Sequence, residues 1–161
     1  MTGCAILIAY FSHSGNTEAI ANQIRGNVDA DVFRISTVDS YPVEYDAVVE
    51  VARREQKNGF RPKLSNQVAN VGPCGVVFVG YPNWWSTMPM AVFSFLEHHD
   101  LSGKKIVPFC THEGSAMGRS MRDLKELCPR SAVLEGLAIR GGQVWTANKA
   151  VSDWLRRNEL S

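Results

Sequence analysis

The chain has 161 residues, 45% of them hydrophobic and 20% charged, a length and a composition that fit one soluble globular domain spanning 1–161. The 17 basic and 16 acidic residues give a net charge of +1, so charge offers no basis for binding nucleic acid or an anionic membrane. No stretch approaches the ~20 apolar residues of a membrane span and the N-terminus has no signal-peptide pattern, so we expect a cytoplasmic protein.

Short apolar runs alternate along the chain with segments of helical periodicity. Runs that are apolar on both faces are typical of strands buried between two helical layers, and one further segment alternates like an edge strand. In chain order the predicted elements are a strand at 4–11, a helix at 16–25, a strand at 30–35, a helix at 45–57, a strand at 75–80, a helix at 89–98, a strand at 105–110, a helix at 120–127, a strand at 132–139 and a helix at 143–157.

This alternation predicts an α/β fold: a doubly wound, three-layer sandwich around a five-stranded parallel sheet. Right-handed crossovers leave few topologies. In the order 2-1-3-4-5 the first and third strands flank the point where the strand order reverses. Open α/β sheets bind ligands at that point, outside the carboxyl ends of the strands.

The first predicted strand is followed at once by Ser12-His13-Ser14-Gly15-Asn16-Thr17 and a helix. Hydroxyl and amide side chains at a helix start either cap its free N–H groups or, together with those groups, hold a phosphate. Gly15 permits a tight turn. The loop contains neither GxxxxGK[ST] nor GxGxxG, so we do not expect Mg-dependent nucleotide chemistry or a dinucleotide.

Two more predicted strands end in distinctive loops. The third runs into Pro82-Asn83-Trp84-Trp85, and two adjacent tryptophans either pack under the next helix or lie against a flat aromatic ligand. The fourth runs into Thr111-His112-Glu113-Gly114, which is either a mobile surface loop or a place where the backbone approaches a ligand closely. All three loops lie at carboxyl ends of strands, so together they suit a ligand with a phosphate at one end and a flat ring at the other.

These three segments resemble the flavin-binding loops of the flavodoxin family. Residues 12–17 are similar to the family's phosphate loop, T/S-x-T-G-x-T, with Gly15 and Thr17 at fixed positions and His13 at a variable, solvent-facing one. The resemblance implies FMN bound without covalent attachment. It also implies that the phosphate and the ring contact Ser12, His13, Ser14, Gly15, Asn16, Thr17, Pro82, Asn83, Trp84, Trp85, Thr111, His112, Glu113 and Gly114.

The resemblance implies electron transfer between redox partner proteins or to small-molecule acceptors. Flavodoxins that act as carriers are typically acidic, whereas this chain is nearly neutral, so an NAD(P)H-dependent FMN or quinone reductase on the same fold is the alternative. The flavin carries the chemistry in either case, and no side chain is assigned a catalytic role. A histidine such as His112 ordinarily titrates near neutral pH and is the candidate for a proton role, but a lone loop histidine usually faces solvent.

Two other hypotheses remain, and the first of them uses the same strand order. A response-regulator-like domain needs an acidic cluster after the first strand, where this chain has Ser12, His13 and Ser14. A binding module without flavin would stay colourless when FMN is added.

The four cysteines show no CxxC spacing and form no Cys/His cluster with metal-site spacing. We therefore expect no metal, and we expect reduced, mostly buried thiols.

Overall fold

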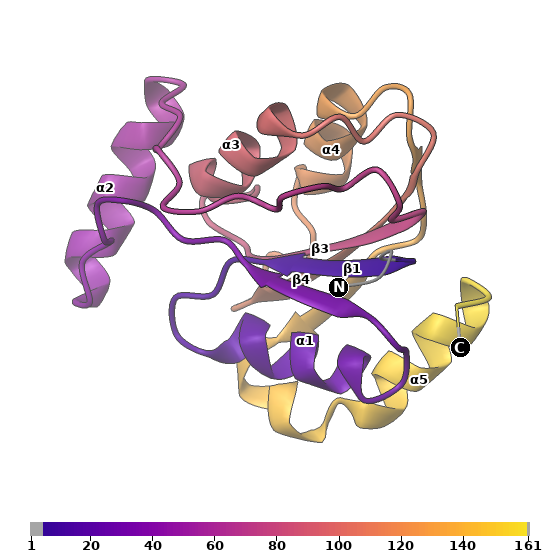
Figure 1. Ribbon diagram of the computed structural model, residues 1–161. Helices are drawn as coiled ribbons and strands as arrows, with labels where there is room; N and C mark the ends of the chain where they lie inside the picture. The colour runs from indigo at the N-terminus through magenta and orange to yellow at the C-terminus, as the bar shows by residue number, and fades with distance from the viewer. Residues whose placement is uncertain (1–4, 161) are drawn as a thin grey trace.

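A parallel sheet forms the centre of the molecule, with helices on both of its faces (Figure 1). The computed structural model describes residues 5–160, so Cys4, which opens the first predicted strand, lies outside the described residues. The strands are β1 (Ile6–Tyr10), β2 (Asp31–Arg34), β3 (Val76–Pro82), β4 (Lys105–His112), β5 (Ala132–Val133) and β6 (Leu137–Arg140). Their order, β2-β1-β3-β4-β5 with β6 also paired to β4, confirms the predicted topology.

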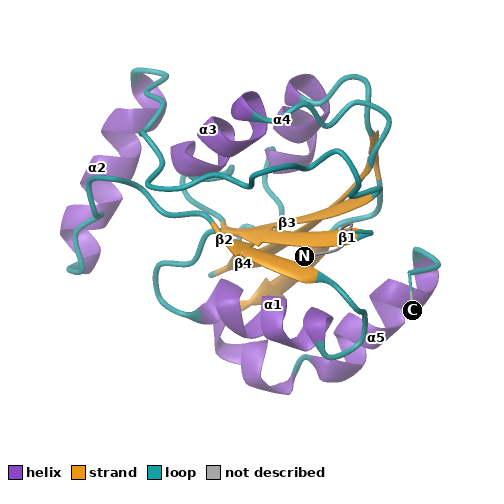
Figure 2. Cartoon of the chain, in the orientation of Figure 1, coloured by secondary structure: helices purple, strands orange, loops and turns teal. Residues whose placement is uncertain are grey.

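The helices divide between the two faces of the sheet, as Figure 2 shows: α1 and α5 cover one face, and α3 and α4 cover the other. The helices are α1 (Asn16–Arg25), α2 (Tyr45–Lys57), α3 (Met90–His98), α4 (Ser120–Leu127), the 3₁₀ helix η1 (Gly141–Thr146) and α5 (Asn148–Arg157). In Figure 1, α2 lies at the left, apart from these two layers.

The hydrophobic core has two halves, one on each face of the sheet. Successive side chains of a strand point to opposite faces, so a central strand must be apolar throughout. In β1, Leu7 and Ala9 belong to one core cluster with Phe95 of α3. Ile8, which lies between them, belongs to the other cluster with Trp154 of α5. Burial on both faces explains why the apolar runs predicted the central strands well.

The fifth strand position departs from the prediction, because the expected strand 132–139 is split into β5 and β6. Between them, the carbonyl of Glu135 accepts hydrogen bonds from the Trp154 indole at 2.8 Å and from the Asn158 amide at 3.0 Å. The Arg157 guanidinium also pairs with the Glu135 carboxylate at 2.8 Å. These bonds turn the Glu135 backbone toward α5, which interrupts its pairing with β4.

The last helix also begins differently from the prediction. Residues 141–146 form η1, and the α-helix starts only at Asn148. The Val144 side chain is buried, and its carbonyl accepts a hydrogen bond of 2.7 Å from the Gln23 side chain of α1. This contact holds η1 against α1, ahead of the regular helix.

The cysteines follow the expectation only in part. Cys110 and Cys128 are free and buried, and burial raises the pKa of the Cys110 thiol to about 12 and that of Cys128 to about 11. Both thiols are therefore protonated at neutral pH. Cys74 is disulfide-bonded, which corrects the expectation of a reduced thiol there.

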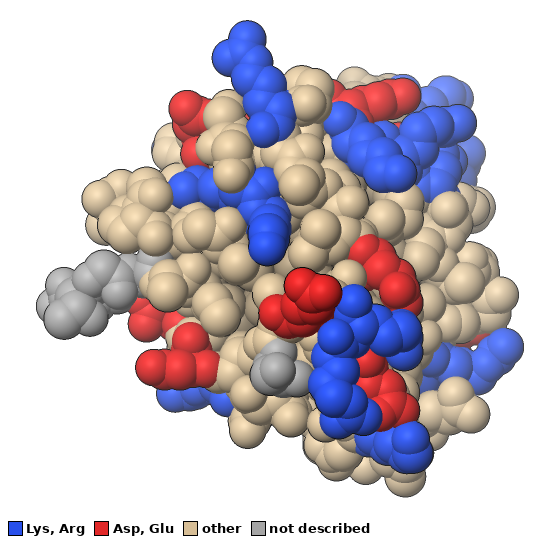
Figure 3. Space-filling view, turned by 90° about the vertical axis from the view of Figure 1, so that its right-hand side faces the viewer, with Lys and Arg blue, Asp and Glu red and all other residues tan. Residues whose placement is uncertain are grey.

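The surface carries charges of both signs. Figure 3, which looks at the right-hand side of Figure 1, shows basic and acidic side chains lying next to one another on that face. Within residues 5–160, no helix combines the length and the apolar character needed to cross a bilayer.

Candidate functional site

The loops that follow β1, β3 and β4 are tied together by hydrogen bonds at the carboxyl edge of the sheet. The hydroxyls of Thr17 and Thr111 are 2.8 Å apart and buried, which joins the start of α1 to the end of β4. The backbone N–H of Asn83 donates to the Thr111 carbonyl at 2.8 Å. The backbone N–H of Phe11 donates to the Gly80 carbonyl at 3.0 Å. The structure therefore brings the three predicted segments to one place.

The first loop is wrapped around the hydroxyl of Ser12. That oxygen accepts hydrogen bonds of 3.2 Å from the amides of Gly15 and Glu18, which fixes the turn and caps the helix. Gly15 adopts φ +98°, a left-handed conformation that favours glycine. A Cβ at Gly15 would meet no atom within 4 Å, so the space beside the loop is open.

The amides of Asn16 and Thr17 belong to the first turn of α1, where N–H groups have no partner inside the helix. These donors lie at the positive end of the helix dipole. Ser14 is exposed and Asn16 is half-buried, whereas Thr17 is only 1% exposed. The Thr17 hydroxyl is thus paired inside the protein, whereas Ser14 is exposed.

His13 was expected to face solvent, but it is half-buried and bonded. Its Nε2 lies 2.7 Å from the Pro42 carbonyl oxygen, so Nε2 is the donor in this hydrogen bond. Its ring lies 5.8 Å from the ring of Trp84 in an edge-to-face contact. The fixed partner in the loop before α2 is the reason that His13 turns inward.

Trp84 is half-buried in an aromatic cluster. Its ring makes edge-to-face contacts with Phe11 at 5.4 Å and with Tyr41 at 5.2 Å. The Tyr41 hydroxyl donates to the Glu55 carboxylate of α2 at 2.6 Å. Burial, with the bond to Glu55 next in effect, raises the pKa of Tyr41 far above its usual value, so the phenol stays protonated.

Trp85 and Ser86 form the tip of a tight turn between the paired residues Trp84 and Thr87. Both tip residues have positive φ, 54° and 72°, as in the turns that close two-residue hairpins. Residues other than glycine are strained in this conformation, and such strained residues are frequent at functional sites. Trp85 is 45% exposed, and its indole N–H donates to the Val49 carbonyl of α2 at 3.0 Å.

The turn docks tightly on the loop that follows β4. The Asn83 side chain donates to the Ala116 carbonyl at 2.8 Å, and the Arg119 amide donates to the Ser86 carbonyl at 2.7 Å. Gly118 has φ +56°, and a Cβ there would lie 2.2 Å from the Ser86 carbonyl oxygen. Glycine is therefore required where the two loops cross.

His112 ends β4, and Glu113 and Gly114 follow it in the third loop. The Nδ1 of His112 accepts the Gly114 N–H at 2.9 Å. Partial burial and the nearby Arg140 guanidinium lower the pKa of His112, against a smaller opposite effect from Glu113. The Arg140 side chain donates to the Glu113 carbonyl at 3.0 Å.

The Glu113 carboxylate lies against the start of α1. A Cβ at Gly141 would lie 2.3 Å from Glu113 Oε2 and 2.8 Å from Asn16 Nδ2, so Glu113 and Asn16 meet at the first residue of η1. Side chains from the third and the first loop therefore converge on Gly141, in addition to the Thr17–Thr111 bond.

The sequence analysis did not place Arg34 near the first loop. Arg34 ends β2, and its guanidinium donates to the Ser12 carbonyl at 3.0 Å. Its other terminal nitrogen pairs with Glu18 at 3.1 Å. The available signal was its place at the carboxyl end of a predicted strand next to the first, but the contact itself depends on the fold.

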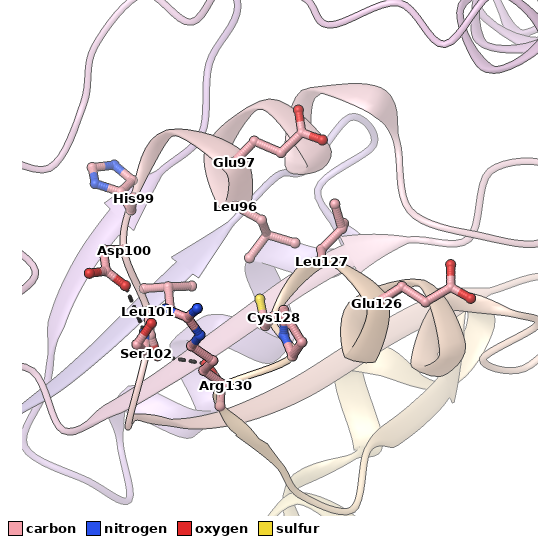
Figure 4. Close-up of a pocket in the computed structure, with 12 residues that line it drawn as sticks. Leu96, Glu97, His99, Asp100, Leu101, Ser102, Glu126, Leu127, Cys128 and Arg130 are labelled. Atoms are coloured by element: carbon pink, nitrogen blue, oxygen red, sulfur yellow. Dashed lines mark hydrogen bonds between the residues drawn. The ribbon is translucent and has the colours of Figure 1, made fainter.

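A cavity of about 470 Å³ lies elsewhere, between the ends of α3 and α4 (Figure 4). His99 and Asp100 follow α3, and Cys128 and Arg130 follow α4. These segments lead into the amino ends of β4 and β5, opposite the three loops. None of the predicted site residues lines this cavity.

Comparisons with known proteins show the family and the fold of the chain. The family model described as Flavodoxin matches residues 5–158. The chain is 33% identical to a candidate flavoprotein from Bacteroides eggerthii, covering 95% of this chain and 96% of that one with a TM-score of 0.81. A comparison with curated proteins gives no match.

Two further solved structures share the fold. A candidate flavoprotein from Bacteroides uniformis is 24% identical, with 96% of this chain and 99% of that chain covered and a TM-score of 0.82. A flavoprotein from Lactobacillus acidophilus, solved in complex with FMN, is 17% identical, with 94% and 98% covered and a TM-score of 0.76.

Proposed function

Because the chain belongs to the flavodoxin family, we propose that it binds FMN without covalent attachment at the carboxyl ends of β1, β3 and β4 and serves in electron transfer. The observation that carries this proposal is the joining of three separate loops by the Thr17–Thr111 and Asn83–Thr111 hydrogen bonds. These bonds hold together the ends of three strands, two of which, β1 and β3, flank the reversal of the strand order.

The donors of the first loop fit a phosphate. The amides of Asn16 and Thr17 lie in the first helical turn, the Ser14 hydroxyl is exposed, and the space beside Gly15 is open. Amides at a helix N-terminus favour an anion through their hydrogen bonds and through the helix dipole. Ser12 holds the turn in shape, and the Thr17 hydroxyl ties it to β4.

The second and third loops suit a flat ring. Trp85, which is partly exposed, would flank one side of the isoalloxazine together with Pro82, Asn83 and Trp84. Residues 111–114 would line the other side. Bound FMN supplies one-electron and two-electron redox chemistry, and the protein orients it and limits its contact with water. The aromatic walls and the fixed turn 84–87 serve this purpose.

The visible spectrum of the purified protein, before and after addition of FMN, tests the proposal. We expect a bound-flavin spectrum, and a colourless protein that leaves FMN free would contradict it. Trp85→Ala should weaken FMN binding, and Trp85→Phe, which also lacks the indole bond to Val49 but keeps an aromatic ring, should weaken it less. Trp145→Ala is the matched control, since Trp145 is a 75% exposed tryptophan outside the proposed site. Equal FMN affinity for wild type and Trp85→Ala would remove Trp85 from the site.

The balanced charge favours a second candidate, an NAD(P)H-dependent FMN or quinone reductase on the same fold. With 17 basic and 16 acidic residues, the chain has no excess of acidic groups for docking to a basic partner. Oxidation of NADPH by the FMN-loaded protein alone would favour the reductase. Reduction only in the presence of a reductase protein would favour the carrier, whose partners are redox proteins or small-molecule acceptors.

A further inference from the structure

Arg34 is anchored beside the first loop by three contacts. Its Nη2 donates to the Ser12 carbonyl at 3.0 Å, its Nη1 pairs with Glu18 at 3.1 Å, and its guanidinium carbon lies 5.7 Å from the centre of the Tyr10 ring. The Tyr10 hydroxyl donates to the same Glu18 oxygen at 3.2 Å. These contacts fix a cation at the edge of the loop.

The charge of the proposed ligand makes this position important. A phosphate monoester carries about −1.5 to −2 charges at pH 7. Residues 12–17 contain no lysine or arginine, so the loop itself offers only dipoles and hydroxyls. The Arg34 side chain remains 45% exposed, and a guanidinium has five N–H donors, so it has donors left after the bonds to Ser12 and Glu18.

We propose that Arg34 is a positioning residue that makes the site selective for the phosphorylated flavin, and that Glu18 is its competing counter-ion. This inference rests on the proposed FMN function. Arg34 holds the loop through the Ser12 carbonyl and places positive charge beside the amides of the first turn of α1. The Glu18 carboxylate attracts the same guanidinium and repels a phosphate, so it opposes the phosphate's binding.

A purely structural brace between β2 and α1 would behave differently. In that case Arg34 and Glu18 would cooperate in shaping the loop, and loss of either partner would weaken the binding of any flavin. Under our proposal, the two residues have opposite effects, and those effects are confined to ligands that carry a phosphate.

The test compares the affinities of the apoprotein for FMN and for riboflavin, measured by flavin fluorescence at low and moderate salt. We expect Arg34→Gln to lower the affinity for FMN about tenfold and to keep the affinity for riboflavin within about twofold of wild type. Arg34→Lys keeps the charge but not the forked geometry, so its FMN affinity should fall in between. Glu18→Gln should strengthen FMN binding, and added salt should shrink all these differences.

Arg53→Gln is the matched control, because Arg53 lies on α2 in a pair with Glu50 and the change in net charge is the same. Melting temperatures of the apoproteins monitor folding. The inference is overturned if Arg34→Gln lowers the affinities for FMN and riboflavin equally. It is also overturned if Glu18→Gln lowers the affinity for FMN, as Arg34→Gln is expected to do. A wild-type protein that binds neither flavin would instead overturn the proposed function, and this inference with it.

Discussion

At the scale of single residues, the hydroxyl pair of Thr17 and Thr111 connects positions 94 residues apart in the sequence. Both side chains are at least 97% buried, being 1% and 3% exposed. A buried hydroxyl without a partner costs about 1–3 kcal/mol, whereas removal of both hydroxyls costs much less. The pair therefore sets the spacing between the loop of residues 12–17 and the end of β4.

We expect Thr17→Val and Thr111→Val each to lower the free energy of unfolding by about 1–3 kcal/mol, because each leaves the other hydroxyl unpaired. The double variant should lose less than the sum of the two, as urea unfolding would measure. If the tie is the role of Thr17, the double variant should also recover FMN affinity relative to Thr17→Val. Strict additivity would contradict a direct bond between the hydroxyls.

The site was predictable from sequence where a residue acts through its own neighbours. Gly15 at a left-handed turn and Ser12 as a helix cap follow from local chemistry, and the sequence predicted both as part of a loop. The partners of Thr17, His13 and Arg34 lie 94, 29 and 22 residues away. Such contacts depend on the register of the sheet and on the path of the loops, which no local pattern contains.

At the scale of elements, the periodicity of apolar residues predicted α1, α2 and α4 with the bounds that the structure has. Their buried stripes are local features, so the sequence displays them directly. The break between β5 and β6 was not predicted, because it depends on bonds from Trp154 and Asn158 to the Glu135 carbonyl. An apolar run shows that a segment is buried, but it does not show that its backbone stays paired.

The crossing of the second and third loops is the junction of elements most sensitive to substitution. Gly118→Ala places a Cβ at φ +56° and 2.2 Å from the Ser86 carbonyl oxygen. We expect a loss of about 2–4 kcal/mol in the free energy of unfolding, from strain and from displacement of the backbone. FMN affinity should fall as well, because the turn 84–87 must move.

Gly142→Ala provides the comparison for Gly118→Ala. Gly142 is exposed, its Cβ would meet nothing within 4 Å, and its φ is not positive. The free energy of unfolding of Gly142→Ala should stay within about 0.5 kcal/mol of the wild-type value. Similar stability of Gly118→Ala and wild type would show that the loops do not cross as closely as described.

At the scale of the whole molecule, the proposed site occupies one end of the sheet, and the ends of α3 and α4 meet at the other. There, the Nε2 of His99 is buried without a hydrogen-bond partner among the described residues. The ring packs 4.7 Å from that of Phe95 and 4.9 Å from that of His98. Burial, followed by the neighbouring His98, lowers the pKa of His99 below its usual value.

This shift makes the stability of the whole fold depend on pH in a definite direction. Below its usual pKa of about 6.5, the unfolded chain binds a proton at His99 before the folded chain does. The free energy of unfolding therefore falls as the pH drops through that value, and the loss is complete only below the lowered pKa of the folded state. His112, whose pKa is also lowered, contributes in the same direction.

We expect His99→Phe to reduce the loss of stability between pH 7.5 and pH 5.5, because a phenyl ring keeps the packing against Phe95 and takes up no proton. At pH 7.5 the variant should be at least as stable as wild type, since it removes an unpaired buried nitrogen. Urea unfolding of both proteins at the two pH values measures the difference. The loss should shrink but not vanish, because His112 still titrates. An unchanged loss in His99→Phe would mean that His99 takes up its proton equally in the folded and unfolded states.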